Sequence, residues 1–248
     1  MRRKILLYIT VLCVAVPNLI AQSEYDRVAA KAQRFFDYQE WASASAMYLL
    51  MMEERPQVPD TYAKAIVSNI MNNDTVQALN LVPRAMNYQV PVDSILVKVR
   101  DVSFSIGRGK LYENFLLDFK NKYSWFSRVA DNYLMQYYAL RQNGPELIHY
   151  AEIMLKGLPD DRNFLRMLAH GQLLDGKTDA AINTWARVVA LYPDDYDTVL
   201  DLANCYDALG NNAAALKWMR RADSLRVTPY VTKRIAALSE AQAGKTNK

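Results

Sequence analysis

Few side chains in this sequence have the types and spacing that catalysis or metal binding requires. The chain contains two histidines, His149 and His170, which are far apart in the sequence, and two cysteines, Cys13 and Cys205. Protein zinc sites use Cys and His ligands, commonly in pairs such as Cys-x-x-Cys or His-x-x-x-His, and neither pair occurs here. The Gly-x-Ser-x-Gly turn that presents a serine nucleophile is also missing. We therefore expect no catalytic residue, no metal site and no bound cofactor.

Two clusters that could carry chemistry are better explained by local structure. The segment Gly107–Lys110 has the residue types of a phosphate-binding loop. It lacks the Gly-x-x-x-x-Gly-Lys-Ser/Thr spacing that wraps backbone amides around a phosphate, so we predict a hairpin turn.

The acidic pairs Asp160-Asp161 and Asp194-Asp195 each follow a proline at the same offset. This recurrence predicts helix N-termini, where carboxylates accept hydrogen bonds from free N–H groups, rather than a general acid and base.

The segment 1–21 has the layout of a secretory signal peptide. Basic residues at positions 2–4 precede an apolar run from Ile5 to Val16, and the small residue Ala21 ends the segment. The run is shorter than the roughly 20 residues that a membrane-spanning helix needs. We expect cleavage after this segment and export, with the bacterial periplasm as the location. An uncleaved N-terminal membrane anchor is the alternative.

Charge and cysteine content narrow the choice of partners. The leader carries three of the 30 basic residues and no acid, which leaves 27 basic residues against 26 acidic ones. A chain so close to neutral has no general excess of positive charge for phosphates, so we expect no nucleic-acid partner. Once Cys13 is removed, the mature chain has one cysteine and no internal disulfide. The position of Cys205 within a helical pattern predicts a buried apolar side chain.

A 34-residue spacing recurs in the C-terminal half of the chain. It separates identical residue types in five pairs: Pro159 and Pro193, Leu168 and Leu202, Ala169 and Ala203, Gly176 and Gly210, and Ala181 and Ala215. A fixed period of this size is typical of supersecondary units stacked in series. The chain has only eight glycines and no long alternating run of β-branched residues, so the repeated unit is predicted to be helical.

The clearest units, residues 162–195 and 196–229, each predict a helix, a tight turn and a second helix. Apolar residues recur at intervals of three and four within each half, glycine lies between the halves, and proline follows the second half. Two antiparallel helices approach closely only where their side chains are small. We therefore expect Ala203 to meet Ala215, with an equivalent alanine crossing in the preceding unit.

This pattern of large and small residues resembles that of the tetratricopeptide repeat family. The resemblance implies an all-α, right-handed superhelical solenoid of antiparallel helix pairs, closed by a C-terminal capping helix at 230–243 and followed by a disordered tail at 244–248. The array would fill residues 22–243 in six units: 25–58, 59–92, 93–127, 128–161, 162–195 and 196–229. Unit 93–127 fits poorly, because Arg100 and Tyr112 fall where small residues are expected. The alternative for the middle is a pair of irregular helices that bridges two short arrays.

The resemblance also implies where a partner would bind. In this family the ligand-facing positions lie on the first helix of each unit. In the last three units these positions hold Asn132, Tyr133, Gln136, Asn163, Arg166, Met167, His170, Asp197, Asp201, Asn204 and Asp207, and earlier units offer Gln33, Phe36, Lys64, Lys98 and Asp101. Such a mixed polar surface suits an extended peptide or a short helix of a partner protein.

Two of these residues allow more specific predictions. The paired Lys and Asn with which the family captures a terminal carboxylate are not reproduced here. Arg166 could pair with a partner's carboxylate instead, or it could form an ion pair with Asp201 inside the groove. His170 could make binding sensitive to pH, although an ordinary surface histidine is the simpler interpretation.

An aromatic cluster lies between residues 112 and 138. Its members are Tyr112, Phe115, Phe119, Tyr123, Trp125, Phe126, Tyr133, Tyr137 and Tyr138. The spacing of the phenylalanines is typical of a helix interior, so core packing is the first interpretation. An aromatic platform for glycan or cell-wall polymer is the alternative.

We therefore expect a non-enzymatic scaffold or adaptor of the bacterial cell envelope that binds a protein partner, with a glycan- or cell-wall-binding module as the alternative function.

Overall fold

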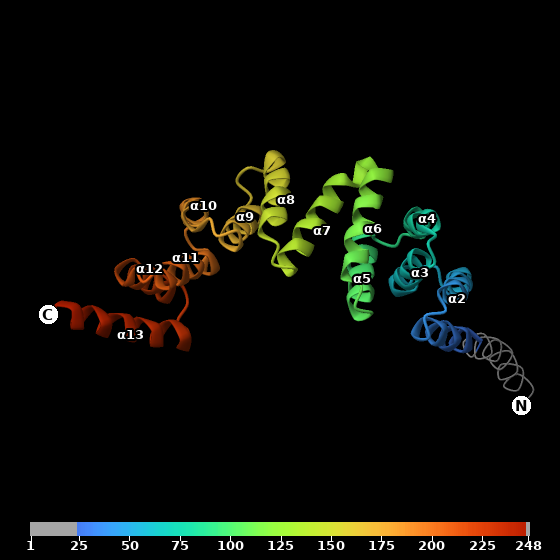
Figure 1. Ribbon diagram of the computed structural model, residues 1–248, viewed down its shortest axis with the longest axis horizontal. Helices are drawn as coiled ribbons and strands as arrows, with labels where there is room; N and C mark the ends of the chain where they lie inside the picture. Colours follow the sequence, from blue (N-terminus) through green and yellow to red (C-terminus); the bar gives the residue numbers. More distant parts are fainter. Residues whose placement is uncertain (1–23, 247–248) are drawn as a thin grey trace, which may run out of the picture. The chain divides into compact units, whose positions relative to one another are not determined.

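The computed structural model describes residues 24–246, and every regular element among them is a helix (Figure 1). The predicted signal peptide at 1–21 lies outside the described residues, as do residues 247 and 248. Short turns join successive helices into pairs within this part of the chain. The prediction of an all-α chain built from antiparallel helix pairs is therefore confirmed.

The helices divide into two compact units, one ending at Tyr123 and the other beginning at Ser124. The sequence had predicted a single series of pairs over residues 22–243. The boundary falls in the segment between the third and fourth pairs, where the repeat pattern is weakest. Each unit has its own buried core, and each is described by itself below.

The first unit, from residue 24 onward, contains three helix pairs. They are the helix of residues 24–37 with α2 (Trp41–Glu54), α3 (Pro59–Met71) with α4 (Thr75–Asn87), and α5 (Val92–Ser105) with α6 (Gly109–Lys122). Helix α3 packs against α2, α4 and α5, and α5 packs against α6. The segment whose pairing the sequence left open thus forms a helix hairpin, because α5 and α6 contact each other across the Gly107 turn.

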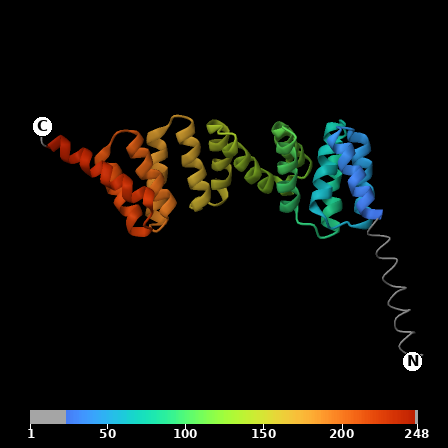
Figure 2. The ribbon, with the colours of Figure 1, turned by 90° about the horizontal axis from the view of Figure 1, so that it is seen from below.

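The second unit begins with a short 3-10 turn, η1 (Ser124–Phe126), and continues up to residue 246 through seven α-helices. These are α7 (Ser127–Leu140), α8 (Gly144–Gly157), α9 (Arg162–Leu174), α10 (Thr178–Leu191), α11 (Tyr196–Ala208), α12 (Asn212–Leu225) and α13 (Pro229–Thr246). Each helix packs on the next one along the chain, and the yellow-to-red part of Figure 2 shows this serial order. A series of contacts between neighbours is the arrangement that a repeat array requires.

The turn inside each helix pair places one residue in the left-handed region of backbone conformation. These residues are Gln39, Asn73, Gly107, Gln142, Gly176 and Gly210, with φ between 53° and 75°. They follow the 34-residue period to within one residue, so the pairs share one type of turn whether or not glycine is present. Gly107–Lys110 forms one of these turns and the start of α6, which confirms the prediction of a hairpin turn.

Small residues are buried in both helices of the two clearest repeats. Ala169 and Ala181 are fully buried in the pair α9–α10, and Ala203 and Ala215 are fully buried in the pair α11–α12. All four belong to one apolar cluster that also contains Trp185. Their burial is what the predicted alanine crossings require, and Cys205 lies in the same cluster as a buried free thiol.

Arginine side chains repeat the same loop contact one period apart. Arg187 Nη2 donates to the carbonyl oxygen of Pro159 at 3.0 Å, and Arg221 Nη2 donates to that of Pro193 at 2.9 Å. Both partners in the second bond lie one full repeat period beyond those in the first. The 34-residue interval thus repeats a specific tertiary contact as well as a residue pattern. In both of these pairs, the second helix holds the loop that precedes the pair.

The C-terminal helix is longer than the sequence predicted. We expected a cap at 230–243 and a disordered tail from 244, whereas α13 runs from Pro229 to Thr246. Most residues at this end have a high helix propensity, namely Ala241, Gln242, Ala243 and Lys245. Their combined propensity exceeds the unfavourable contribution of Gly244, the residue that suggested the end of the helix. Val231 and Leu238 on α13 are buried against α12 and the cluster that contains Trp185, so the helix does cover that core.

The aromatic cluster of residues 112–138 is mostly interior. Tyr112, Phe115, Phe119 and Tyr123 are buried in the first unit, and the three tyrosines of α7 are buried in the second. Phe126 is half-buried, and Trp125 is largely exposed, with an exposed fraction of 72%. Core packing, the first interpretation of these residues, is confirmed.

We expect Gly144→Ala to destabilise the second unit by about 2–3 kcal/mol, because an added methyl group would overpack a close helix contact. A Cβ at Gly144 would lie 2.7 Å from the backbone nitrogen of Asp175 and 2.9 Å from the carbonyl oxygen of Gly171, and backbone atoms cannot move aside easily. Urea unfolding followed by circular dichroism measures the change.

Gly176→Ala is the matched control for this substitution. A Cβ there would meet no atom within 4 Å, although φ is +75°. The control should lose about 1 kcal/mol, from the left-handed backbone alone. Equal losses in the two variants would contradict the idea that α8 and α9 are held together by close backbone approach.

Candidate functional site

The side chain of Arg166 lies among three aspartates. It projects from α9, and its Nε lies 3.9 Å from Asp195 Oδ2, its Nη1 3.6 Å from Asp197 Oδ2 and its Nη2 3.6 Å from Asp201 Oδ2. The ion pair between Arg166 and Asp201 that the sequence allowed is therefore present. Arg166 is held inside the protein's own charge cluster, which leaves it less suited to capture a partner's carboxylate.

The start of α11 explains why the three carboxylates converge. Asp195 occupies the position just before the helix, and Asp197 and Asp201 are separated by about one helical turn, so they share one helix face. The carboxylate of Asp195 accepts a hydrogen bond from Thr198 Oγ1 at 2.5 Å rather than from a backbone N–H. Asp161 shows the predicted capping behaviour in full, since it accepts hydrogen bonds from the backbone of Asn163 and Phe164 at the start of α9.

The contacts of Arg166 with these aspartates are electrostatic rather than hydrogen-bonded. All three distances exceed the range of an N–H···O hydrogen bond. The Nε atom is buried and has no hydrogen-bond partner among the described residues. The guanidinium is thus held by charge, with donor capacity left over, and the carboxylates keep most of their acceptor capacity.

Asp201 carries the perturbed carboxyl group of this cluster. Burial raises its pKa above the ordinary value of 3.8, and the nearby charge of Asp197 adds to the increase, whereas Arg166 and His170 act in the opposite direction. Burial outweighs the single arginine, so the negative charge of Asp201 is incompletely compensated.

The same polar surface continues from α11 onto α13. The hydroxyl of Tyr230 donates to Asn204 Oδ1 at 2.8 Å. Arg234 binds Asp207 through two parallel hydrogen bonds of 2.6 and 2.5 Å, a paired geometry that fixes both side chains. Helix α13 therefore supplies side chains to this surface in addition to covering the core.

Two of these α13 residues could have been found from the repeat period. Tyr230 lies one period after Tyr196, and Arg234 lies two periods after Arg166. Residues 230–243 are predicted from the sequence only as a cap, so neither residue is among the predicted site residues. The same holds for Arg226, whose guanidinium carbon lies 3.6 Å from the centre of the Tyr196 ring and whose Nη2 lies 3.5 Å from Asp197.

The remaining predicted residues differ in how accessible they are. On α9, Asn163 and His170 are exposed and Met167 is half-buried. On α7, Asn132 and Gln136 are half-buried, but Tyr133 has an exposed fraction of only 8%, which leaves little of its ring for a partner. We define the α9–α11 face by the members that the structure presents, namely Asn163, Arg166, Met167, His170, Asp197, Asp201 and Asn204.

The Cys205 thiol is in surroundings that disfavour reactivity. Burial raises the pKa of the Cys205 thiol, with a smaller contribution from Asp179, and so disfavours the reactive thiolate. Within residues 24–242, no group of three or more His, Cys, Asp or Glu side chains is arranged to hold a metal ion. None of the helices in the described part of the chain combines the length and the apolar character needed to cross a membrane.

Comparison with protein families places the repeat period in a known class. Residues 172–232, from the end of α9 to the start of α13, match a family model described as tetratricopeptide repeat. These residues are therefore similar to tetratricopeptide repeats. The match falls where the 34-residue spacing is clearest and covers less than half of the chain. No curated protein matches the chain.

Solved tetratricopeptide repeat structures show a distant likeness. The C-terminal part of a repeat protein from Cytophaga hutchinsonii is 13% identical, with 78% of this chain and 77% of that one covered at a TM-score of 0.48. A repeat protein from Parabacteroides merdae is 16% identical, with 88% and 92% covered at 0.46. The TPR2AB domain of yeast Sti1 in its pHSP90 complex is 11% identical, with 88% and 99% covered at 0.39. At these TM-scores the likeness gives no basis for a shared partner.

Asp201→Asn should change how stability depends on pH. Between the ordinary pKa of 3.8 and the raised pKa, the folded protein binds a proton that the unfolded chain has released. The contribution of Asp201 to the free energy of unfolding therefore falls as pH rises through this window. The variant lacks this loss, so its stability relative to the original chain should increase from acid to neutral pH in urea unfolding.

Asn204→Ala on the same helix is the control, because it removes no titratable group. Its stability difference from the original chain should stay constant over the same pH range. A difference for Asp201→Asn that stays flat, or that decreases as pH rises, would show that the carboxyl group is not destabilised by burial.

Proposed function

We propose that this protein is a non-enzymatic scaffold or adaptor that binds a protein partner on the α9–α11 face, and that the partner presents a cationic segment there. The observation that carries the proposal is the cluster in which three carboxylates surround one arginine. Tetratricopeptide repeats support the general role, since stacked helix pairs form extended surfaces for other proteins.

The charge balance of the face favours a basic partner. Asp195, Asp197 and Asp201 face two arginines, Arg166 and Arg226, so one negative charge remains uncompensated. Burial raises the pKa of Asp201, and the neighbouring charge of Asp197 raises it further. A lysine or arginine from a partner would supply the missing charge, whereas a partner carboxylate would add a fourth negative group beside Arg166.

Accessibility supports the same conclusion. The side chains of Asp197 and Asp201 are 57% and 40% exposed, so a partner can reach both carboxylates without unfolding the helix pairs. His170 is exposed on the neighbouring helix, and Asn204 lies on the same helix face as Asp197 and Asp201. Charged groups would give orientation and association rate, and the neutral polar groups would add directional hydrogen bonds.

A glycan- or cell-wall-binding function has less support. That alternative required an aromatic platform between residues 112 and 138, and most of those rings are buried in the helix cores. Sugar-binding platforms need exposed ring faces, and in this cluster only Trp125 is largely exposed. The burial therefore favours the protein-binding function over the glycan-binding one.

Charge substitutions on the α9–α11 face should test the proposal directly. With a fluorescent lysine-rich peptide as probe, we expect Asp197→Asn with Asp201→Asn to weaken binding roughly fivefold, equivalent to about 1 kcal/mol for partly exposed charges. Arg166→Gln should leave binding unchanged or strengthen it, because it removes a competing cation. Fluorescence anisotropy measures both effects, and circular dichroism verifies that helicity is retained.

Glu152→Gln with Asp179→Asn is the matched control. Both residues are exposed on second helices of the same unit, so the pair removes the same charge away from the face. It should leave binding within twofold of the original chain, about the scatter expected from non-specific electrostatics. Weaker binding of the basic probe by Arg166→Gln, or equal losses in the control, would refute a cation-binding face.

We also propose that the protein acts in the bacterial cell envelope. The proposal rests on the basic, apolar and small-residue layout of residues 1–21. Expressed in a bacterium with its full sequence, the secreted form should begin near Gln22 when its N-terminus is sequenced. Recovery of the intact N-terminus in the membrane fraction would favour an anchor, and recovery in the cytoplasm would refute export.

A further inference from the structure

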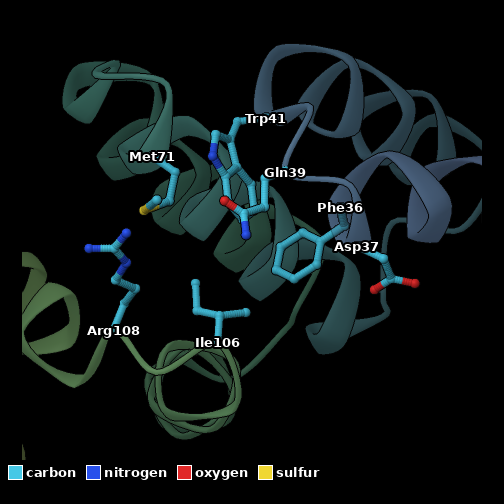
Figure 3. A pocket seen from close by; sticks show the side chains of 7 residues that line it. All are labelled: Phe36, Asp37, Gln39, Trp41, Met71, Ile106 and Arg108. Carbon is cyan, nitrogen blue, oxygen red and sulfur yellow. The ribbon is translucent and has the colours of Figure 1, made fainter.

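The first unit contains a cavity of about 280 Å³ at the edge where its helix turns lie (Figure 3). Its lining comes from the end of the first helix and the following turn, from the end of α3, and from the turn after α5. The lining residues are Phe36, Asp37, Gln39, Trp41, Met71, Ile106 and Arg108. Side chains from all three helix pairs of the unit thus meet around one space, well separated in sequence from the α9–α11 face.

Aromatic and aliphatic groups form the walls of this cavity. Phe36 has an exposed fraction of only 6%, and its ring packs edge-on against Trp41 with 5.3 Å between centroids. Trp41, Met71 and Ile106 are half-buried, so each keeps apolar surface available toward the space. Figure 3 shows Phe36 and Met71 on opposite sides, with Ile106 pointing between them. An apolar group placed there would bury surface on several sides, which favours binding.

The polar groups at the rim give the cavity a preference for negative charge. Arg108 is exposed and makes no ion pair with another described residue, and Figure 3 shows its guanidinium extending beside the space. Asp37 points away from the centre and accepts a hydrogen bond of 2.7 Å from Gln33 Nε2. The cation therefore lies beside the cavity, while the anion is turned outward and already bonded.

Gln39 adds a neutral polar group at the rim of the cavity. Its backbone has φ of +61°, in the left-handed region that a residue with a Cβ seldom adopts. The turn holds this conformation, and Figure 3 shows the side-chain amide beside Trp41 at the edge of the space. The amide can donate as well as accept, so it complements the purely donating guanidinium of Arg108.

We propose that this cavity binds a compact apolar or aromatic group that carries a carboxylate. The apolar body would lie between Phe36, Met71 and Ile106, and the carboxylate would pair with Arg108 at the rim. The volume suits one aromatic or branched aliphatic side chain with its carboxylate. A free aromatic acid and the C-terminal residue of another protein both have this chemistry. This site is separate from the α9–α11 face and goes beyond the function proposed for it.

The test uses the whole mature chain and two small probes, N-acetyl-L-phenylalanine and its amide. Binding is followed by NMR through the indole N–H signal of Trp41, identified by its loss in Trp41→Phe. We expect the acid to shift this signal in a saturable manner and the amide to bind about tenfold more weakly. Absence of a saturable shift with the acid, or equal affinities of the acid and the amide, would overturn the proposal.

Substitutions locate the carboxylate and separate this site from the α9–α11 face. Arg108→Gln should weaken binding of the acid about tenfold and leave that of the amide unchanged. Arg141→Gln, in a turn of the second unit, and Asp201→Asn should leave both unchanged. A loss with Arg141→Gln equal to that with Arg108→Gln would overturn the assignment. Because the lysine-rich probe is measured independently, failure at one site leaves the other result intact.

A pair of peptides distinguishes the two sources of the ligand. A hexapeptide ending in phenylalanine with a free carboxylate is compared with the same peptide carrying a terminal amide. Tighter binding of the free peptide than of N-acetyl-L-phenylalanine would assign the cavity to protein C-termini, since additional residues would contact its rim. Binding of the free amino-acid derivative with exclusion of the peptide would assign it to a small acid. Failure of both to bind would refute the proposal.

Discussion

Close approach of helices at small residues is the constraint on which the rest of this structure depends. Alanines are fully buried in the pairs α9–α10 and α11–α12, and Gly144 and Gly171 allow α8 to approach α9 through backbone contact. Because each crossing fixes where the next helix begins, the loops and their arginine contacts recur at the same interval. The position of every side chain on the first helices follows from this packing.

The charge cluster of the α9–α11 face is a product of that packing. Arg166 belongs to one helix pair and its three aspartate neighbours belong to the start of the next, so the cluster exists only when the pairs are stacked. Burial raises the pKa of Asp201 although an arginine is nearby. An array of this kind thus assembles a polar surface from consecutive repeats, and the charge balance of that surface depends on which residues adjacent repeats contribute.

The two compact units use the same helix pair in different ways. In the second unit, the polar faces of the first helices form the candidate site, and α13 extends it through Tyr230 and Arg234. In the first unit, the turns between paired helices enclose an aromatic-walled cavity. The left-handed turn residue is glycine in some pairs and glutamine or asparagine in others. At Gln39 this exchange leaves an amide at the edge of that cavity, where glycine would leave none.

The sequence by itself determined the all-helical class, the helix pairs, the alanine crossings and the hairpin turn at Gly107, because these depend on local periodicity and residue size. The ion pair between Arg166 and Asp201 could also be predicted, since the repeat period relates positions on adjacent first helices. Only the tertiary structure decided that Tyr133 and most of the 112–138 aromatics are buried, that α13 reaches Thr246, and that residues from three turns enclose a cavity. Burial and cavity formation depend on how separate segments pack in space, and a repeat pattern read along one chain does not contain that information.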